Sequence, residues 1–304
     1  MERIKQALEK AREERLTAGG ATAKTGATGS VTPAGQIMYT DTRTEEVPIS
    51  FLREMRVITA VESGSFTDAY GILRTQVLQR LREKRWNALA VTSPGAHEGK
   101  TLTAINLAIS LAREVDYTVL LVDADLRHPS VHTYFGIHPE RGLGDYLVGD
   151  IPLAELLIHP SGIGRFVILP GGKSLENSSE MLNSPKMARL VEELKTRYSS
   201  RIVLFDLPPL LSIADTLAFS PYVDAALLVI EDGKTPAPEI ERATELLAQN
   251  TNLIGTVLNK AHTIQSKDRQ SPPWPDRVMD RLSNNRLLAT IGTKLLARNS
   301  RQQR

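Results

Sequence analysis

Hydrophobic residues follow two kinds of pattern between residues 47 and 261. Short, nearly continuous apolar runs are typical of strands buried on both faces of a sheet, and they cover Ala88–Thr92, Val119–Asp123, Phe166–Leu169, Arg201–Phe205, Ala225–Ile230 and Leu253–Leu258. Between several of these runs, apolar residues recur at helical spacing over Thr101–Arg113, Ser179–Tyr198 and Pro238–Gln249. Strands and helices in alternation predict an α/β fold with a mostly parallel sheet wrapped by helices.

The chain before this region divides into two parts. Residues Met1–Leu16 place apolar side chains on one helical face, which fits either a short helix that needs a partner surface or a frayed, charged terminus. The next stretch, Thr17–Glu46, is rich in Ala, Gly and Thr, and we interpret it as a flexible linker. We therefore expect an N-terminal helix and linker over 1–46 and a folded domain over 47–262.

The C-terminal stretch 263–304 is predicted to be a basic tail. From Ala261 to Arg304 the chain carries nine Lys or Arg and three Asp, and its apolar residues lie among the cations in a roughly amphipathic pattern. Such a pattern suits peripheral contact with an anionic membrane surface or with a partner helix. A loosely helical, solvated tail fits the same pattern equally well.

Composition narrows the class of protein. The 304 residues are 41% hydrophobic and 24% charged, which excludes collagen-like and wholly disordered chains. The absence of Cys excludes disulfides, thiolate zinc sites and cysteine nucleophiles. No apolar run is long enough for a signal peptide or a bilayer span, so we expect a cytoplasmic location. A formal net charge of +2 gives no global case for binding nucleic acid.

The segment Ser93–Thr101 carries the strongest chemical signal. A predicted strand ends just before it, a loop with one Pro and two Gly follows, and Lys100 and Thr101 open a helix. Backbone N–H groups in such a loop point at phosphate oxygens, and Gly99 lets the backbone approach closely. Lys100 supplies a point charge for the β and γ phosphates, and the Thr101 hydroxyl can bind Mg²⁺. The context predicts a nucleotide site, although Gly95 lies one residue later than the usual spacing and a structural turn is the alternative.

Two further strand patterns end in carboxylates. Asp123 and Asp125 close the run TVLLVDAD, and Asp206 closes RIVLFD. Because the carboxyl ends of parallel strands share one edge of a sheet, where such folds bind ligands, we expect these acids to lie beside Lys100. There they suit the organisation of Mg²⁺ or the acceptance of a proton from an attacking hydroxyl. Each acid alone also fits an exposed turn, but the three motifs in this order are far more specific.

The motifs SPGAHEGKT, VLLVDADLRHP and IVLFDLPP resemble the Walker A, A′ and B motifs of bacterial tyrosine kinases, which accompany capsule and exopolysaccharide assembly. Within that family, RIKQALEKA, FLREMRVIT and TAINLAISLA are most similar to the branch in exosortase-linked (PEP-CTERM) exopolysaccharide loci. The resemblance implies a doubly wound fold of the P-loop NTPase (MinD/ParA-like) type, ATP with Mg²⁺, and phosphorylation of tyrosines in the partner subunit's tail. It also implies an inner-membrane polysaccharide co-polymerase of the chain-length-determinant type as partner, and control of polymer length or export.

The resemblance also implies roles for individual residues. Lys100 would contact the phosphates, Asp123 would be the base or a further metal-organising carboxylate, and Asn259 would read the adenine edge. The implied catalytic residues are Lys100, Asp123, Asp125 and Asp206, the implied metal ligands are Thr101, Asp125 and Asp206, and the implied nucleotide-binding residues are Gly95, Ala96, His97, Glu98, Gly99, Lys100, Thr101, Leu102 and Asn259.

Three features depart from the family pattern. His97 stands where the family loop has a glycine, so it is expected to be strained if that glycine uses a positive φ. In the helix that assembles the family's ring, the pattern ExxRxxR is matched by Asp68, Gly71 and Arg74, so a homo-oligomer stays open but an octameric ring is not implied. The C-terminal tail carries no Tyr, which leaves Tyr39 as the most accessible candidate acceptor.

Three functions stay open at this point. The first is an ATP-dependent tyrosine kinase of the exopolysaccharide system, held at the inner face of the cell membrane by its partner. The second is a nucleotide-gated ATPase that regulates the membrane co-polymerase without phosphorylating protein, which the absence of tail tyrosines favours. The third is a MinD/ParA-type ATPase, whose signature Lys in KGGxGKT would replace Gly95. We favour the kinase family.

Overall fold

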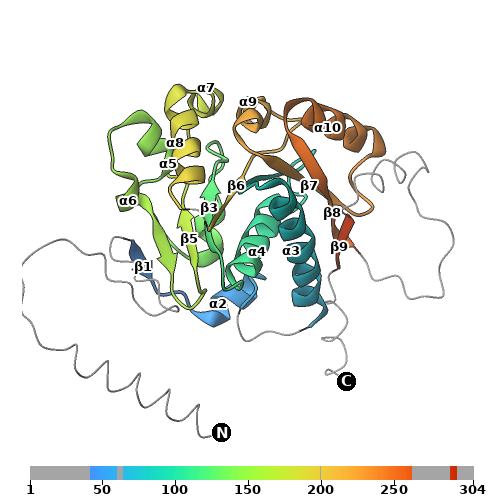
Figure 1. The fold of residues 1–304 in the computed structure, drawn as a ribbon, viewed down its shortest axis with the longest axis horizontal. Helices are drawn as coiled ribbons and strands as arrows, with labels where there is room; N and C mark the ends of the chain where they lie inside the picture. The colour runs from blue at the N-terminus through green and yellow to red at the C-terminus, as the bar shows by residue number, and fades with distance from the viewer. Residues whose placement is uncertain (1–41, 60–63, 199, 262–287, 293–304) are drawn as a thin grey trace, which may run out of the picture. The chain divides into compact units, whose positions relative to one another are not determined.

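One nine-stranded sheet organises the described part of the chain (Figure 1). The computed structural model describes residues 42–59, 64–198 and 200–261, and the backbone of 288–292. All of them belong to the second of two compact units, Met1–Met38 and Tyr39–Arg304. Across the sheet the strands are β1 (Arg43–Glu45), β4 (Ile158–Pro160), β5 (Phe166–Leu169), β3 (Thr118–Asp123), β6 (Arg201–Asp206), β2 (Ala88–Thr92), β7 (Ala225–Glu231), β8 (Asn252–Ala261) and β9 (Leu288–Gly292).

Neighbouring strands run parallel from β5 to β9, and only the β4–β5 pair is antiparallel among the described strands. β6 lies between β3 and β2, and it pairs Asp206 with both Asp123 and Val91. The prediction of a mostly parallel sheet is therefore confirmed. This strand order also brings the carboxyl ends of β3, β6 and β2 together, where parallel α/β folds bind ligands.

Helices cover both faces of the sheet. Successive residues of a strand point to opposite faces, so Leu89 and Val91 of β2 enter one hydrophobic core whereas Ala88 and Ala90 enter the other. On the first face lie α2 (Ile49–Glu54), α3 (Ser65–Lys84), α4 (Lys100–Ala112) and the 3₁₀ helix η1 (Val131–Phe135). On the second lie α5 (Leu143–Val148), α6 (Leu153–Leu156), α7 (Ser178–Leu182), α8 (Pro185–Thr196), α9 (Asp215–Phe219), the 3₁₀ helix η2 (Ser220–Tyr222) and α10 (Ala237–Asn250). The fold is thus the doubly wound P-loop NTPase type.

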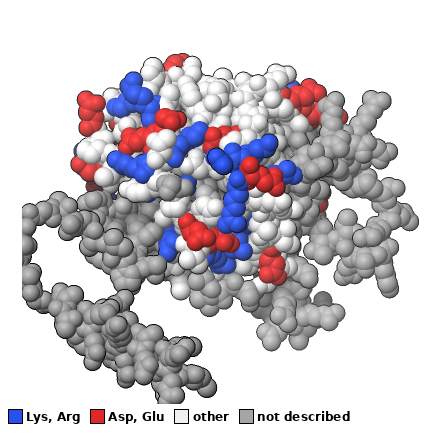
Figure 2. Space-filling view, viewed as in Figure 1, with Lys and Arg blue, Asp and Glu red and all other residues white. Residues whose placement is uncertain are grey.

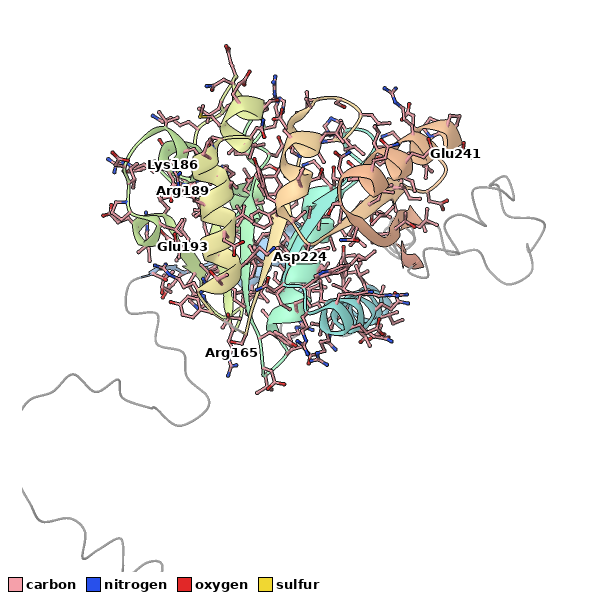
Figure 3. All side chains as sticks on the ribbon, turned by 45° about the horizontal axis from the view of Figure 1, so that its top comes forward. Arg165, Lys186, Arg189, Glu193, Asp224 and Glu241 are labelled. Carbon is pink, nitrogen blue, oxygen red and sulfur yellow. The ribbon has the colours of Figure 1, made fainter. Side chains whose placement is uncertain are left out.

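The helix predicted over Ser179–Tyr198 is two helices, α7 and α8. Ser184 caps α8, because its hydroxyl accepts the Met187 backbone N–H at 3.1 Å, and Pro185 occupies the first turn. Proline favours that position because it needs no N–H partner there. α8 then buries its apolar face and points Lys186, Arg189 and Glu193 outward (Figure 3).

Two expectations for the ends of the chain are wrong in part. Residues Arg43–Glu45, expected to belong to the flexible linker, form strand β1 beside β4. Residues Leu288–Gly292, expected to continue an amphipathic tail, form strand β9 parallel to β8. Edge strands this short carry little pattern of their own, since their partners supply the pairing. Residues 1–41, 262–287 and 293–304, which include the predicted N-terminal helix and most of the predicted tail, lie outside the described residues.

The surface carries both signs of charge. On the face in Figure 2, Lys and Arg are interspersed with Asp and Glu rather than gathered in one basic area. None of the described helices is long and apolar enough to cross a membrane.

Candidate functional site

The loop between β2 and α4 has the backbone of a phosphate-binding loop. Gly99 precedes α4 with φ 94°, in the region that favours glycine, and no side chain caps the helix there. The first N–H groups of α4 therefore stay available to an anion. A Cβ on Gly99 would come within 2.0 Å of the Asn259 side-chain nitrogen. This close approach explains why the position requires glycine.

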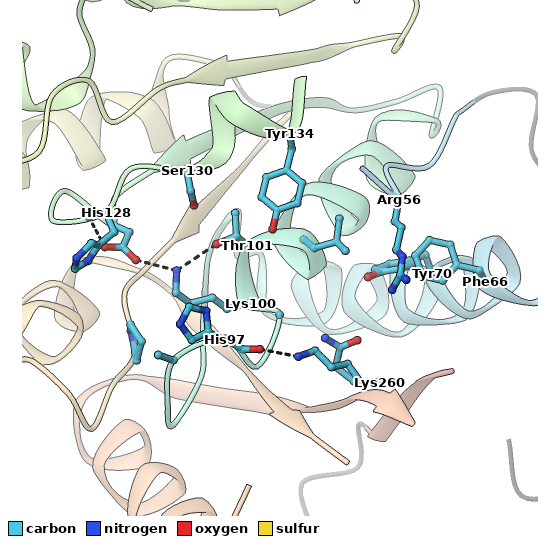
Figure 4. A pocket seen from close by; sticks show the side chains of 16 residues that line it. Arg56, Phe66, Tyr70, His97, Lys100, Thr101, His128, Ser130, Tyr134 and Lys260 are labelled. Carbon is cyan, nitrogen blue, oxygen red and sulfur yellow. Dashed lines mark hydrogen bonds and ion pairs between the residues drawn. The ribbon is translucent and has the colours of Figure 1, made fainter. Parts of the chain in front are cut away.

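A cleft of about 700 Å³ opens over this loop (Figure 4). Most of the predicted nucleotide-binding residues line it, namely Ala96, His97, Gly99, Lys100, Thr101, Leu102 and Asn259. Gly95 and Glu98 do not line the cleft. Glu98 is buried, and its carboxylate turns toward Thr235. The sequence did not identify the other lining residues, which are Arg56, Phe66, Tyr70, His128, Ser130, Tyr134, Pro209 and Lys260.

Lys100 lies among the predicted carboxylates. Its ammonium is 2.9 Å from Asp125 Oδ2 and 3.7 Å from Asp206 Oδ1, and it donates to the Thr101 hydroxyl at 3.2 Å. Asp123 is also buried here, and its Oδ2 accepts two backbone N–H groups at 2.8 and 2.9 Å. Asp125 lines the cleft, whereas Asp123 and Asp206 are fully buried. The structure thus brings together the residues that the sequence predicted to meet, while their roles stay predictions.

Burial and mutual repulsion shift the charge state of this cluster. Burial raises the pKa of both Asp123 and Asp206, and the charge of Asp206 raises that of Asp123 further. Burial opposes the charge on Lys100, but Asp206 and Asp125 raise its pKa above the ordinary value. A buried carboxylate without enough positive charge around it favours its protonated form. The cluster is therefore short of cations.

The residues present fit Mg²⁺. Both oxygens of Asp206 and Oδ1 of Asp123 are buried without a hydrogen-bond partner among the described residues. Buried polar atoms are normally satisfied, and oxygen is the donor that Mg²⁺ prefers. No group of three or more acidic, His or Cys side chains in the described ranges is arranged to hold a metal by itself. Mg²⁺ commonly takes one or two carboxylates and completes its shell with water and substrate phosphates.

His97 has the strain that the sequence analysis expected. Its φ is 63°, in the left-handed region, which costs a residue with a Cβ roughly 1–2 kcal/mol. Two side chains from the end of β8 contact the loop beside it. Lys260 Nζ donates to His97 O, and Asn259 Nδ2 donates to Glu98 O, both at 2.8 Å. Lys260 was not predicted from the sequence. Its position directly after Asn259, at the end of a buried strand, was the one feature that could have indicated it.

The chain is similar to several known proteins. A family model described as an AAA domain matches residues 91–238. The tyrosine-protein kinase YwqD of Bacillus subtilis (strain 168) is 33% identical over 208 residues, which cover 68% of this chain and 86% of that protein. The succinoglycan biosynthesis transport protein ExoP of Rhizobium meliloti (strain 1021) is 31% identical over 221 residues, but this chain spans only 27% of its length.

A solved structure gives the same result. The kinase domain of the Escherichia coli tyrosine kinase ETK superposes with a TM-score of 0.63 at 28% identity, covering 75% of this chain and 93% of that domain. The shared fold, the P-loop with its strand-end acids and the extent of the match to YwqD lead to one assignment. The chain belongs to the bacterial tyrosine-protein kinase family.

Proposed function

We propose that this chain is an ATP- and Mg²⁺-dependent protein-tyrosine kinase that acts in exopolysaccharide or capsule assembly. The observation that carries the proposal is the contact of Lys100 with Asp125 and Asp206, beside the buried Asp123, at a P-loop cleft of about 700 Å³. Phosphoryl transfer is catalysed mainly by positioning and by compensation of charge, and these groups supply both.

The P-loop residues bind and orient the nucleotide. The free N–H groups at the start of α4 and the Lys100 ammonium would hold the β and γ phosphates. The Thr101 hydroxyl, Asp125 and Asp206 would hold Mg²⁺, which when bound neutralises developing charge on the phosphate oxygens. Asn259 lines the same cleft, and we assign it the adenine edge.

The reaction would move one phosphoryl group and one proton. The acceptor tyrosine oxygen bonds to the γ-phosphorus, the bond from that phosphorus to the β–γ bridging oxygen breaks, and ADP leaves. The phenolic proton passes to a carboxylate. Asp123 is the proposed base, because burial raises its pKa and its Oδ1 has no hydrogen-bond partner among the described residues. Asp125, which lines the cleft, is the alternative.

Purified protein incubated with labelled ATP and Mg²⁺ tests the proposal. We expect phosphotyrosine on the chain itself or on a co-polymerase partner, and none with Lys100→Met. Asp123→Asn should abolish transfer while Mg²⁺ and nucleotide bind as before, which would identify Asp123 as the base. Asp125→Asn should weaken Mg²⁺ binding as well, because Asp125 is a proposed metal ligand. Label on neither protein, despite bound ATP, would reject the kinase.

That negative outcome would support the second candidate, a nucleotide-gated ATPase regulator. The observation favouring it is the absence of Tyr from residues 263–304, where the family resemblance leads one to expect acceptors. ATP hydrolysis that responds to the partner without any phosphotyrosine would establish it. A MinD/ParA-type ATPase is disfavoured because Gly95 occupies the position of that group's signature Lys.

The partner and location are part of the same proposal. The similarity to ExoP, a succinoglycan biosynthesis transport protein, supports an inner-membrane polysaccharide co-polymerase as partner. The sequence resemblance to the exosortase-linked branch is the reason for proposing a partner from those systems. That partner would hold the chain at the cytoplasmic face of the membrane. The basic tail would add peripheral contact, and self-association through α3 would build a homo-oligomer.

A further inference from the structure

The carbonyl side of the P-loop is held from outside the loop. A phosphate cradle needs successive backbone N–H groups turned inward, and its carbonyl groups must then face away. Two of them, on His97 and Glu98, accept hydrogen bonds from Lys260 and Asn259 at 2.8 Å each. Figure 4 shows Lys260 reaching the His97 carbonyl from the end of β8.

Glu231, at the end of β7, fixes the position of the Lys260 ammonium. Its Oε2 lies 2.9 Å from Lys260 Nζ. Its backbone N–H donates to the Thr235 hydroxyl at 2.8 Å, and that hydroxyl donates to Glu98 at 2.6 Å. Burial alone would raise the pKa of Glu231, but the hydrogen bonds from Lys260 and Lys234 hold that pKa below its ordinary value. The Lys260 ammonium is therefore held between Glu231 and the P-loop.

The residues that this contact joins are both in an unfavourable backbone conformation. His97 has φ 63° and Lys260 has φ 57°. Side chains with a Cβ persist in this region only where the surroundings hold them, and such strain concentrates at functional sites. The Lys260 bond is a contact that can hold His97 there.

We propose that Lys260, anchored by Glu231, is a positioning residue that keeps the P-loop in its phosphate-receiving conformation before nucleotide arrives. It acts through the His97 carbonyl and takes no part in phosphoryl transfer. This inference rests on the proposed nucleotide-binding function.

Lys260→Met and Lys234→Met form a matched test. Both remove one positive charge from Glu231, which Lys234 contacts at 3.3 Å, but only Lys260 also bonds to the loop. We expect Lys260→Met to weaken Mg²⁺–ADP binding and to raise KM for ATP about 10-fold, the equivalent of ~1.4 kcal/mol, with kcat within about twofold. Lys234→Met should bind as the unmodified chain does, and Lys260→Arg should restore most of the affinity. Equal affinity for the two Met variants would overturn the proposal.

Hydrogen exchange of the loop amides gives a readout that needs no nucleotide. In the ligand-free protein, amides of residues 95–99 should exchange about 10-fold faster in Lys260→Met and at the unmodified rate in Lys234→Met. Unchanged exchange in the first variant overturns the proposal even if ATP never binds. If Lys260→Met does not fold, Glu231→Gln should show a smaller change in the same direction, and no change would overturn it. If the unmodified chain itself does not bind nucleotide, that result would instead reject the proposed function.

Discussion

At the scale of single residues, Gly99 is a P-loop position with no room for a side chain. A Cβ there would lie 2.0 Å from the Asn259 amide nitrogen, and φ is 94°. Gly99→Ala should therefore displace Asn259, strain the loop and weaken Mg²⁺–ADP binding at least about 10-fold. Titration with a fluorescent nucleotide measures this. Adding Asn259→Ala removes the steric conflict, but it also removes the proposed adenine contact and leaves the unfavourable φ, so affinity should not return to that of the unmodified chain. Full recovery would contradict both the adenine role of Asn259 and the cost of the backbone conformation.

We expect the buried carboxylate of Asp123 to lower the free energy of unfolding at high pH. Burial raises its pKa in the folded protein, so the folded state binds more protons than the unfolded state. Stability is then highest below the ordinary pKa of Asp and falls as pH rises through the raised value. Asp123→Asn removes this loss and should raise the unfolding free energy at pH 8 in EDTA by more than ~1 kcal/mol.

Thermal denaturation across pH measures the effect of Asp123→Asn. The difference from the unmodified chain should shrink toward pH 4, where Asp123 is protonated when folded. A variant less stable than the unmodified chain at pH 8 would contradict the proposed electrostatic cost.

The sequence predicted one half of the residue-level site and missed the other. Asp123, Asp125 and Asp206 could be placed beside Lys100 because they lie at or just after the ends of two parallel strands, and such ends share one edge of the sheet. The bond from Lys260 to His97 joins residues 163 positions apart. This hydrogen bond depends on how the P-loop packs against the end of β8, and no local sequence pattern predicts a contact between residues so far apart in the chain.

At the scale of elements, one buried side chain docks the segment after α2. Asn106 of α4 accepts the Ile58 N–H at 2.8 Å and donates to Arg56 O at 3.0 Å. Asn106→Ala leaves the buried Ile58 N–H without a partner and removes the donor to the partly buried Arg56 carbonyl, so it should destabilise the protein by ~1–3 kcal/mol. Thermal denaturation checks this, with Thr75→Ala at an exposed position of α3 as a control that should change stability by under ~0.5 kcal/mol. An equal effect for both variants would contradict the docking role.

Element type was more predictable than element limits. The buried strands were identified because short, continuous apolar runs such as Ala225–Ile230 are typical of strands buried on both faces of a sheet. The break between α7 and α8 was missed although Ser184 and Pro185 are a cap and a first-turn residue, because the apolar spacing continues across them. β1 was missed for a different reason, since three residues paired at a sheet edge have no periodicity to detect.

At the scale of the whole molecule, strand order is what makes the site. β6 lies between β3 and β2, so the two acid-bearing strand ends lie side by side and next to the P-loop strand, although the three strands are far apart in the sequence. Helices on both faces then exclude water from Asp123 and Asp206, which raises the pKa of both. The same architecture that positions the carboxylates therefore also makes them require a cation.

Every site residue, and every strand that positions it, lies in the unit Tyr39–Arg304. A shortened chain that begins at Tyr39 should therefore unfold within about 2 °C of the full chain and bind Mg²⁺–ADP equally well. A chain that begins at Pro48 is the control. It loses β1, the Glu45 carbonyl that accepts the Ser161 N–H at 2.8 Å and the buried Val47, so its Tm should fall by at least about 4 °C. If the chain beginning at Tyr39 were destabilised as much as the control, residues 1–38 would belong to the cooperative fold, and the nucleotide-binding unit would be larger than its strands and helices indicate.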